Sequence, residues 1–168
     1  MSGQDRPAFD AAFWFQWIMA TTLGWLLGGY LLANLPIFPG GIGAAVLQWP
    51  ILYRRLPQAW RWVVATTMAW IAGAIMLLLL AVPAELRPWL AGLVIGPTVG
   101  LAQWFILRRE VHWAGWWIVI STIAWITGLL LVPGALSTGS LAGAITGLAL
   151  MLLFRAPRPP NPVQEETA

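Results

Sequence analysis

The side chains that most often carry out chemistry are scarce in this chain of 168 residues. It has no cysteine and no lysine, which excludes disulfides, thiolate ligands, cysteine nucleophiles and lysine Schiff bases. The single histidine, His112, follows Arg108 and Arg109, where a solvated imidazole is more common than a haem or chlorophyll ligand. Ser121 and Ser137 have no base beside them in the sequence. We therefore expect a protein that is not an enzyme, with no catalytic residue, no metal site and no cofactor.

Ionisable side chains do not fall well inside any of the long apolar segments. Ion-coupled transporters, proton pumps and voltage sensors place such groups within the membrane, and intramembrane proteases need paired carboxylates, a Ser–His pair or a zinc cluster. The sequence disfavours these classes. Nucleic acid is disfavoured as a partner too, because the nine arginines are divided among short loops and form no clustered basic face.

The composition indicates a membrane protein. Hydrophobic residues make up 60% of the chain, charged residues only 9%, and the mean hydropathy is +0.76. A soluble domain carries about 25% charged residues, so this chain has too few to cover a surface in water. The lipid bilayer is therefore the first partner that the sequence predicts.

Six apolar segments are each close to the length that spans a bilayer as a helix. They cover residues 13–35, 37–53, 60–82, 89–107, 113–132 and 136–154. We expect an all-α integral membrane protein with six transmembrane helices in residues 13–154, preceded by a short cytoplasmic N-terminus at 1–12. Residues 155–168 are rich in proline and polar residues, which predicts a disordered cytoplasmic tail.

Eight of the nine arginines fall on one side of this six-helix arrangement, and Arg87 alone falls on the other. By the positive-inside rule, both termini and the loops near residues 54–59 and 108–112 are cytoplasmic. The predicted location is a bacterial inner (plasma) membrane.

The segments repeat a pattern of tryptophan, threonine and glycine. The motif Trp-x4-Thr-x2-Trp-x2-Gly starts at Trp17, Trp62 and Trp117. The intervening segments carry Gly-x3-Ala/Gly-x2-Gln-Trp, ending at Gln48-Trp49 and Gln103-Trp104, whereas the last copy has Leu150-Met151 instead. We interpret the chain as three hairpin repeats, near residues 13–53, 60–107 and 113–154, in a pseudo-three-fold arrangement.

These repeated hairpins, with Arg-Arg after the Gln-Trp pair, resemble multi-pass membrane proteins of bacteria whose activity is uncharacterised. The resemblance covers Phe13 to Arg155. It implies a fold of membrane hairpins and no particular site.

Small residues and amides in the segments predict helix packing. Glycines recur every fourth residue, and such stripes let another backbone approach closely. An amide inside the membrane must find a partner on a neighbouring helix, such as a carbonyl or a hydroxyl. The predicted packing residues are Gly92, Gly96, Gly100, Gly139, Gly143, Gly147, Gln48 and Gln103.

Twelve of the thirteen tryptophans divide into two groups. We expect nine of them to form an aromatic belt at the cytoplasmic headgroups: Trp14, Trp17, Trp49, Trp60, Trp62, Trp104, Trp113, Trp116 and Trp117. Trp25, Trp70 and Trp125 lie about 12 Å deeper by helix rise. Each has a threonine three residues earlier as a partner for its indole N–H: Thr22, Thr67 and Thr122. These six residues either pack the core or line an apolar cavity on the repeat axis.

Two functions remain open on the sequence alone. The first is a non-catalytic structural or accessory subunit, held to partner subunits or to a second copy of the chain by its glycine faces and tryptophans. The second is a binder or carrier of a neutral or apolar molecule, such as a lipid, quinone or pigment, between the repeats. Water-accessible polar positions along the axis would favour the carrier, and a dry core would favour the subunit.

Overall fold

The regular elements are six α-helices, with no strand among the residues that the structure describes. The structure is a computed structural model that describes residues 10–31, 40–83, 85–131 and 134–156. The helices are α1 (Ala11–Leu31), α2 (Gly40–Leu52), α3 (Trp60–Leu79), α4 (Arg87–Leu107), α5 (Trp116–Leu130) and α6 (Ala135–Leu153). The all-α prediction is therefore confirmed. Most of the tail expected to be disordered, and residues 32–39 between the first two helices, lie outside the described residues.

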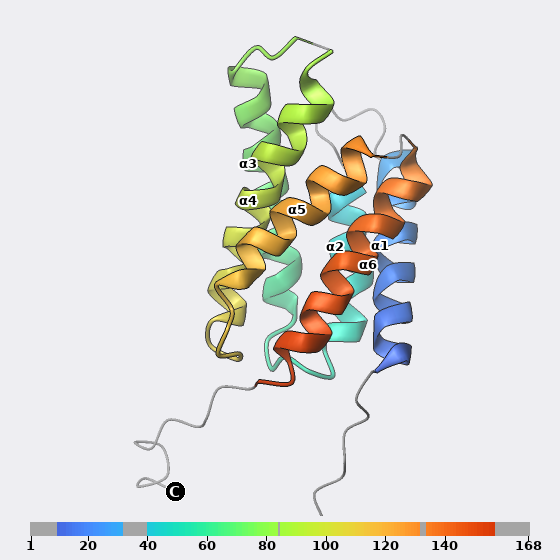
Figure 1. Cartoon of the computed structure of the whole chain (residues 1–168), viewed down its shortest axis with the longest axis vertical. Helices are drawn as coiled ribbons and strands as arrows, with labels where there is room; N and C mark the ends of the chain where they lie inside the picture. The colour runs from blue at the N-terminus through green and yellow to red at the C-terminus, as the bar shows by residue number, and fades with distance from the viewer. Residues whose placement is uncertain (1–9, 32–39, 84, 132–133, 157–168) are drawn as a thin grey trace, which may run out of the picture.

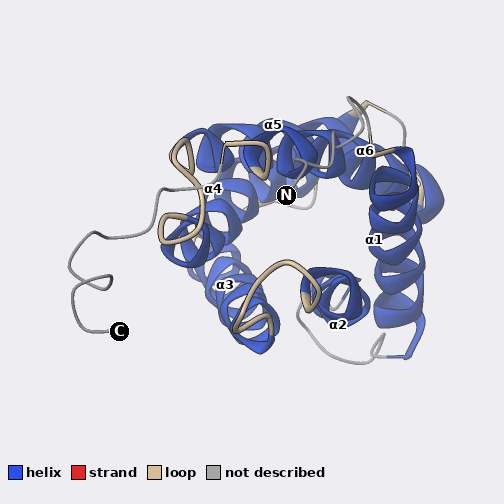
Figure 2. Ribbon diagram, turned by 90° about the horizontal axis from the view of Figure 1, so that it is seen from below, coloured by secondary structure: helices blue, strands red, loops and turns tan. Residues whose placement is uncertain are grey.

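The helices form a closed ring in which each packs against its two neighbours in sequence, and α6 closes the ring against α1. Figure 2 shows this arrangement around a central axis, and Figure 1 shows neighbouring helices running in alternating directions. α2 and α3 share the smallest of the six interfaces. A ring of this kind places one side of each helix toward the axis and the other toward the surroundings.

Glycines let the helix backbones come close in this ring. A Cβ atom on Gly96 would lie 2.7 Å from Thr122 Cα of α5, and one on Gly139 would lie 2.7 Å from Thr22 Cα of α1. The predicted stripes on α4 and α6 thus lie against α5 and α1. The sequence pattern missed a third close approach, between α1 and α2, where a Cβ on Gly24 would lie 2.4 Å from Ala44 Cα.

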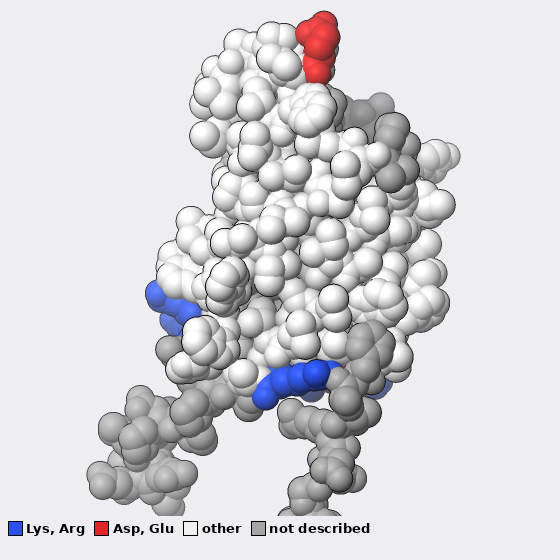
Figure 3. Space-filling model, viewed as in Figure 1, with Lys and Arg blue, Asp and Glu red and all other residues white. Residues whose placement is uncertain are grey.

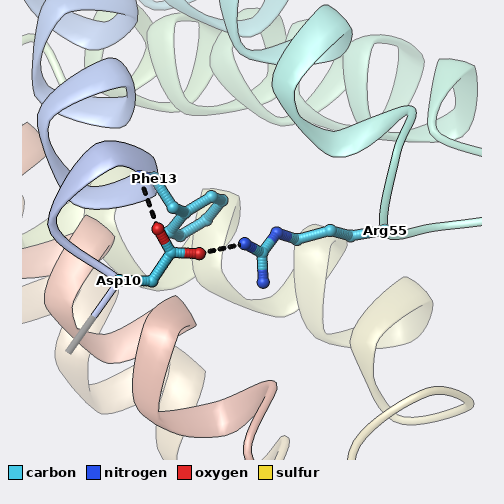
Figure 4. Close-up of polar contacts among 3 residues, drawn as sticks. All are labelled: Asp10, Phe13 and Arg55. Carbon is cyan, nitrogen blue, oxygen red and sulfur yellow. Dashed lines mark hydrogen bonds and ion pairs between the residues drawn. The ribbon is translucent and has the colours of Figure 1, made fainter. Parts of the chain in front are cut away.

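The start of α1 is fixed by a side-chain cap and an ion pair (Figure 4). Asp10 precedes the helix, and its Oδ1 accepts a 3.0 Å hydrogen bond from the backbone N–H of Phe13. Its Oδ2 pairs with the Arg55 guanidinium from the loop after α2, and Arg55 also lies 4.4 Å from the centre of the Phe13 ring. The hydrogen bond from Phe13 N–H and the pairing with Arg55 together outweigh the desolvation of Asp10 and lower the pKa of its carboxyl group.

Three of the helices are long and apolar enough to cross a membrane, judged by length and composition: Trp60–Leu79, Trp89–Leu107 and Ala135–Leu153. The helix bounds differ from the predicted segments by at most four residues at any end. α2 and α5 have only 13 and 15 residues. At 1.5 Å of rise per residue they span about 20 Å and 22 Å, which is shorter than a hydrocarbon core of about 30 Å.

Candidate functional site: a tryptophan-filled axis

The ring axis is occupied by two sets of tryptophans. Trp25, Trp70 and Trp125 form an inner triad in which every ring touches the other two, with centroid separations of 5.5, 5.2 and 4.9 Å. Trp70 and Trp125 are buried and Trp25 is partly buried against the same core cluster. α1, α3 and α5 thus each supply one indole to a shared contact. The spacing of the repeated motif had placed these three residues at equal depth, and the structure brings them together.

A second set lies nearer the arginine-rich end, eight residues or about two helix turns from the first on each helix. This arginine-end triad consists of Trp17, Trp62 and Trp117, each exposed by 1% or less. Trp62 contacts Trp17 at 5.9 Å and Trp117 at 5.8 Å between ring centroids. The sequence placed these three in the headgroup belt, and that interpretation is wrong. Other members of the expected belt, Trp49, Trp60, Trp113 and Trp116 among them, are exposed.

Two glutamines explain why these indoles can be buried. Trp62 Nε1 donates a 3.0 Å hydrogen bond to Gln48 Oε1, and Gln48 Nε2 donates to Thr21 Oγ1 at 2.9 Å. The chain of bonds joins α3, α2 and α1. A buried indole N–H is costly unless it has an acceptor, and the amide supplies one while its own N–H is also satisfied.

The same set of bonds recurs one repeat later. Trp117 Nε1 donates to Gln103 Oε1 at 2.9 Å, and Gln103 Nε2 donates to Thr66 Oγ1 at 2.8 Å. In both copies the tryptophan follows its glutamine by 14 residues. Each glutamine therefore ties its own helix to the helix before it and to the helix after it.

The third copy replaces the glutamine by a threonine. Leu150 stands at the position of the amide and cannot accept a hydrogen bond. Trp17 Nε1 donates instead to Thr146 Oγ1 on α6, at 2.9 Å, and Thr146 Oγ1 donates in turn to the Ala142 carbonyl at 2.6 Å. This bond joins the last helix to the first, so the polar contacts continue where the ring closes.

The space left on the axis is small. A cavity of about 20 Å³ lies between the two triads, and among its lining residues are Trp62, Trp70 and Trp125 with Thr21, Thr66 and both glutamines. Trp70 Nε1 is buried there, and no described residue accepts its hydrogen bond. Of the six residues predicted as cavity candidates, only Trp70 and Trp125 line it.

Among the described residues, no hydrogen bond joins Trp25, Trp70 or Trp125 to its predicted threonine partner. Thr22 Oγ1 lies 3.2 Å from Ser140 Oγ, Thr122 Oγ1 donates to the Ile118 carbonyl at 2.7 Å, and Thr67 is half-buried. The residues one position earlier, Thr21, Thr66 and Ser121, are each exposed by 3% or less, and Thr22 is buried as well. A helical step of 100° separates neighbouring positions, which is enough to move a side chain off the axial face.

Gly41 is a site residue that the sequence reasoning treated only as part of a repeat. A Cβ on Gly41 would lie 1.9 Å from Trp70 Cε2, so the indole of Trp70 rests directly on the backbone of α2. Likewise, a Cβ on Gly40 would lie 2.7 Å from Trp25 Cδ2. The sequence repeat had matched Gly41 to Gly96 and so indicated a close contact at Gly41. Residue spacing alone does not show which helix or side chain packs against that glycine.

The described side chains on the axis pack against one another and form hydrogen bonds, and none of them is a typical catalytic group. Its polar atoms are indole N–H groups, amides and hydroxyls, and the described residues contain no group of three or more His, Cys, Asp or Glu side chains that could hold a metal ion. Comparison of the chain with protein-family profiles, with curated proteins and with solved structures gave no match.

Proposed function

We propose that the chain is a non-catalytic structural or accessory subunit of an assembly in the bacterial inner membrane. The observation that carries the proposal is the filled axis. Side chains of the ring itself occupy the interior, and the axial cavity of about 20 Å³ is far below the ~300 Å³ at the lower end of pockets for small molecules. A ring packed in this way supports a role in holding helices together. It gives no support to the carrier alternative, which needs room for a lipid, quinone or pigment between the repeats.

The outer surface supports a location in lipid. Large apolar side chains are exposed on all six helices, for example Phe15, Val46, Met68, Leu93 and Val119. Such a surface in water would be an aggregation liability, whereas lipid chains solvate it well. We extend the membrane assignment from the three long apolar helices to all six, with α2 and α5 crossing where neighbouring helices cover them or the bilayer thins.

The distribution of charge supports the proposed orientation. Arg54 and Arg55 follow α2, Arg108 and Arg109 follow α4, and Arg155 follows α6. Figure 3 shows blue side chains toward the lower end and red ones at the upper end, with an uncharged band between them. The arginine-rich end is therefore proposed to face the cytoplasm, with both termini on that side.

A pseudo-three-fold arrangement of the hairpins is part of the proposal. It is supported by the inner triad, to which α1, α3 and α5 contribute one tryptophan each, and by the two equivalent Trp–Gln–Thr sets. The smaller interface of α2 with α3 is a departure from equal packing.

Native mass spectrometry tests the proposed role. The protein is released from its own membranes in mild detergent and weighed intact. A particle heavier than the 18.4 kDa chain, with other subunits or a second copy in fixed ratio, is the expected result. A lone chain that retains one defined small molecule, other than a phospholipid of the surrounding bilayer, would overturn the subunit role in favour of the carrier. Recovery of the chain in the soluble fraction would overturn the membrane location itself.

A further inference from the structure

A hollow on the described surface lies outside the axis, between α3 and α4 at the arginine-rich end. Its volume is about 540 Å³. The walls come from the first turns of α3 and the last turns of α4, and the loops at residues 56–58 and 109–110 close its end. We call this hollow the α3–α4 groove.

The groove combines an apolar wall with positive charge. Val64, Ala65 and Phe105 line it one turn inside the helix ends. Arg61 and Arg109 line it at the end of the ring, and both are exposed. In the described part of the chain, no carboxylate forms an ion pair with either guanidinium.

Glu110 is the third charged group of the groove and is half-buried. Two arginines against one carboxylate leave a net positive charge. The charge lies at the depth where the proposed orientation puts the cytoplasmic headgroups, and the apolar wall lies deeper, where acyl chains run. A ligand that fits must be negative at one end and a hydrocarbon along the rest.

We infer that the α3–α4 groove binds an anionic phospholipid. Its phosphate lies between Arg61 and Arg109, where guanidinium groups bind phosphate oxygens through paired hydrogen bonds, and an acyl chain follows Val64, Ala102 and Phe105. The inference rests on the proposed membrane location. It adds a lipid preference that the proposed subunit role does not require.

The test compares the binding of two lipids with identical chains, phosphatidylglycerol and phosphatidylcholine, to the purified protein by native mass spectrometry at a series of lipid concentrations. Wild-type protein is expected to prefer phosphatidylglycerol. The double variant Arg61→Gln/Arg109→Gln is expected to bind it about 30-fold more weakly, at roughly fivefold per arginine near an anionic lipid. Its affinity for phosphatidylcholine is expected to change little.

The matched control is Arg54→Gln/Arg155→Gln. It removes the same charge from the same end of the ring, at exposed residues that do not line the groove. We expect this control to keep the wild-type preference. An equal loss in both double variants would overturn the site, since it would reflect the charge of the whole end.

Two further variants separate lipid binding from damage to the fold. Glu110→Gln removes the negative charge of the groove and is expected to tighten phosphatidylglycerol binding about fivefold. Ala65→Trp fills the apolar wall and is expected to weaken binding of both lipids. Glycerol phosphate, which has the headgroup charge without chains, is expected not to compete at equal concentration. If it displaces the lipid, the groove is a site for phosphate groups in general and the lipid assignment fails.

The proposed function and the lipid site fail in different ways. A chain that stays in the membrane fraction but shows no preference for phosphatidylglycerol, or loses none in Arg61→Gln/Arg109→Gln, overturns the site alone. A chain found outside the membrane fraction overturns the location on which both depend.

Discussion

Two tryptophans on α3 differ in a way that single substitutions can expose. Trp62 donates its N–H to Gln48, whereas the buried N–H of Trp70 has no acceptor among the described residues. Trp62→Phe leaves Gln48 Oε1 without a donor, so we expect a loss of about 1–3 kcal/mol in the free energy of unfolding in addition to the lost ring volume. Trp70→Phe loses similar volume but also removes an unsatisfied donor, so its cost should be clearly smaller.

The measurement is unfolding by SDS in mixed micelles, followed by far-UV circular dichroism. The two variants share the helix, the chemical change and full burial, so each serves as the control for the other. Equal destabilisation, or a larger loss in Trp70→Phe, would contradict the assigned hydrogen bonds.

Asp10 predicts a pH dependence at the start of α1. Its pKa is lowered in the folded chain, chiefly by the hydrogen bond from Phe13 N–H and by Arg55. The charged form therefore stabilises the fold at pH values above the unfolded pKa, near 3.9, and this stabilisation is lost as the pH falls through the lower folded pKa. Both side chains of the ion pair are about one third exposed, so the effect should be modest.

The variants Asp10→Asn and Asp10→Ala isolate this contribution. Asparagine retains an N-cap acceptor but not the ion pair, while alanine loses both, and we expect alanine to cost about 1 kcal/mol at pH 7. Stability measured from pH 7 to pH 3 should fall more steeply for the wild type than for either variant. Parallel curves would show that Asp10 contributes nothing to the acid sensitivity.

The arginine-end triad shows where reasoning from residues alone stops. An indole is apolar with one donor, so Trp17, Trp62 and Trp117 suit a headgroup belt and a buried hydrogen-bonded position equally well. What decides between them is an acceptor on another helix, 14 residues earlier for Trp62 and Trp117. The glutamines were recognised as packing residues, but their partners depend on which helices become neighbours in the ring.

At the scale of the helices, substitution of two glycines on α1 by alanine is expected to change the stability of the fold in opposite directions. A Cβ on Gly24 would meet Ala44 Cα and Gly43 O of α2 at 2.4 and 2.5 Å, whereas one on Gly29 would meet nothing within 4 Å. Gly24→Ala must push two backbones apart, so we expect it to destabilise the fold by about 2 kcal/mol or more. Gly29→Ala should stabilise it by up to about 1 kcal/mol, because alanine favours helix.

The same SDS unfolding assay measures both glycine variants. They introduce the same methyl group into the same helix, five residues apart. The higher helix propensity of alanine alone would raise the stability of both variants. An unchanged or more stable Gly24→Ala variant would therefore contradict the close crossing of α1 and α2.

The helices themselves were largely predictable, because long apolar runs bounded by proline, glycine and arginine leave few alternatives. The stripe of Gly92, Gly96 and Gly100 also predicted a close approach on α4. Its partner helix was not predictable, since a glycine stripe fits any backbone. The role of Gly41 beneath Trp70 was missed for the same reason.

For the whole molecule, the closed ring determines which loops lie at the same end. Because sequential helices are neighbours and run in alternating directions, the loops after α2 and α4 lie at one end and the loop after α3 at the other (Figure 1). In the proposed orientation, reporters fused after Pro57 and Val111 should therefore be cytoplasmic, and one fused after Glu85 should be outside.

Paired alkaline phosphatase and green fluorescent protein fusions at these three points measure the topology, since the first is active only outside and the second fluoresces only in the cytoplasm. Replacing Arg54, Arg55, Arg108 and Arg109 by glutamine weakens the positive-inside bias and should produce mixed signals, while replacing Arg87 should not. If Pro57 and Val111 report opposite sides, the segment between them crosses an odd number of times. α3 and α4 would then not both span the membrane, and the alternating ring would be lost together with the proposed cytoplasmic position of the α3–α4 groove.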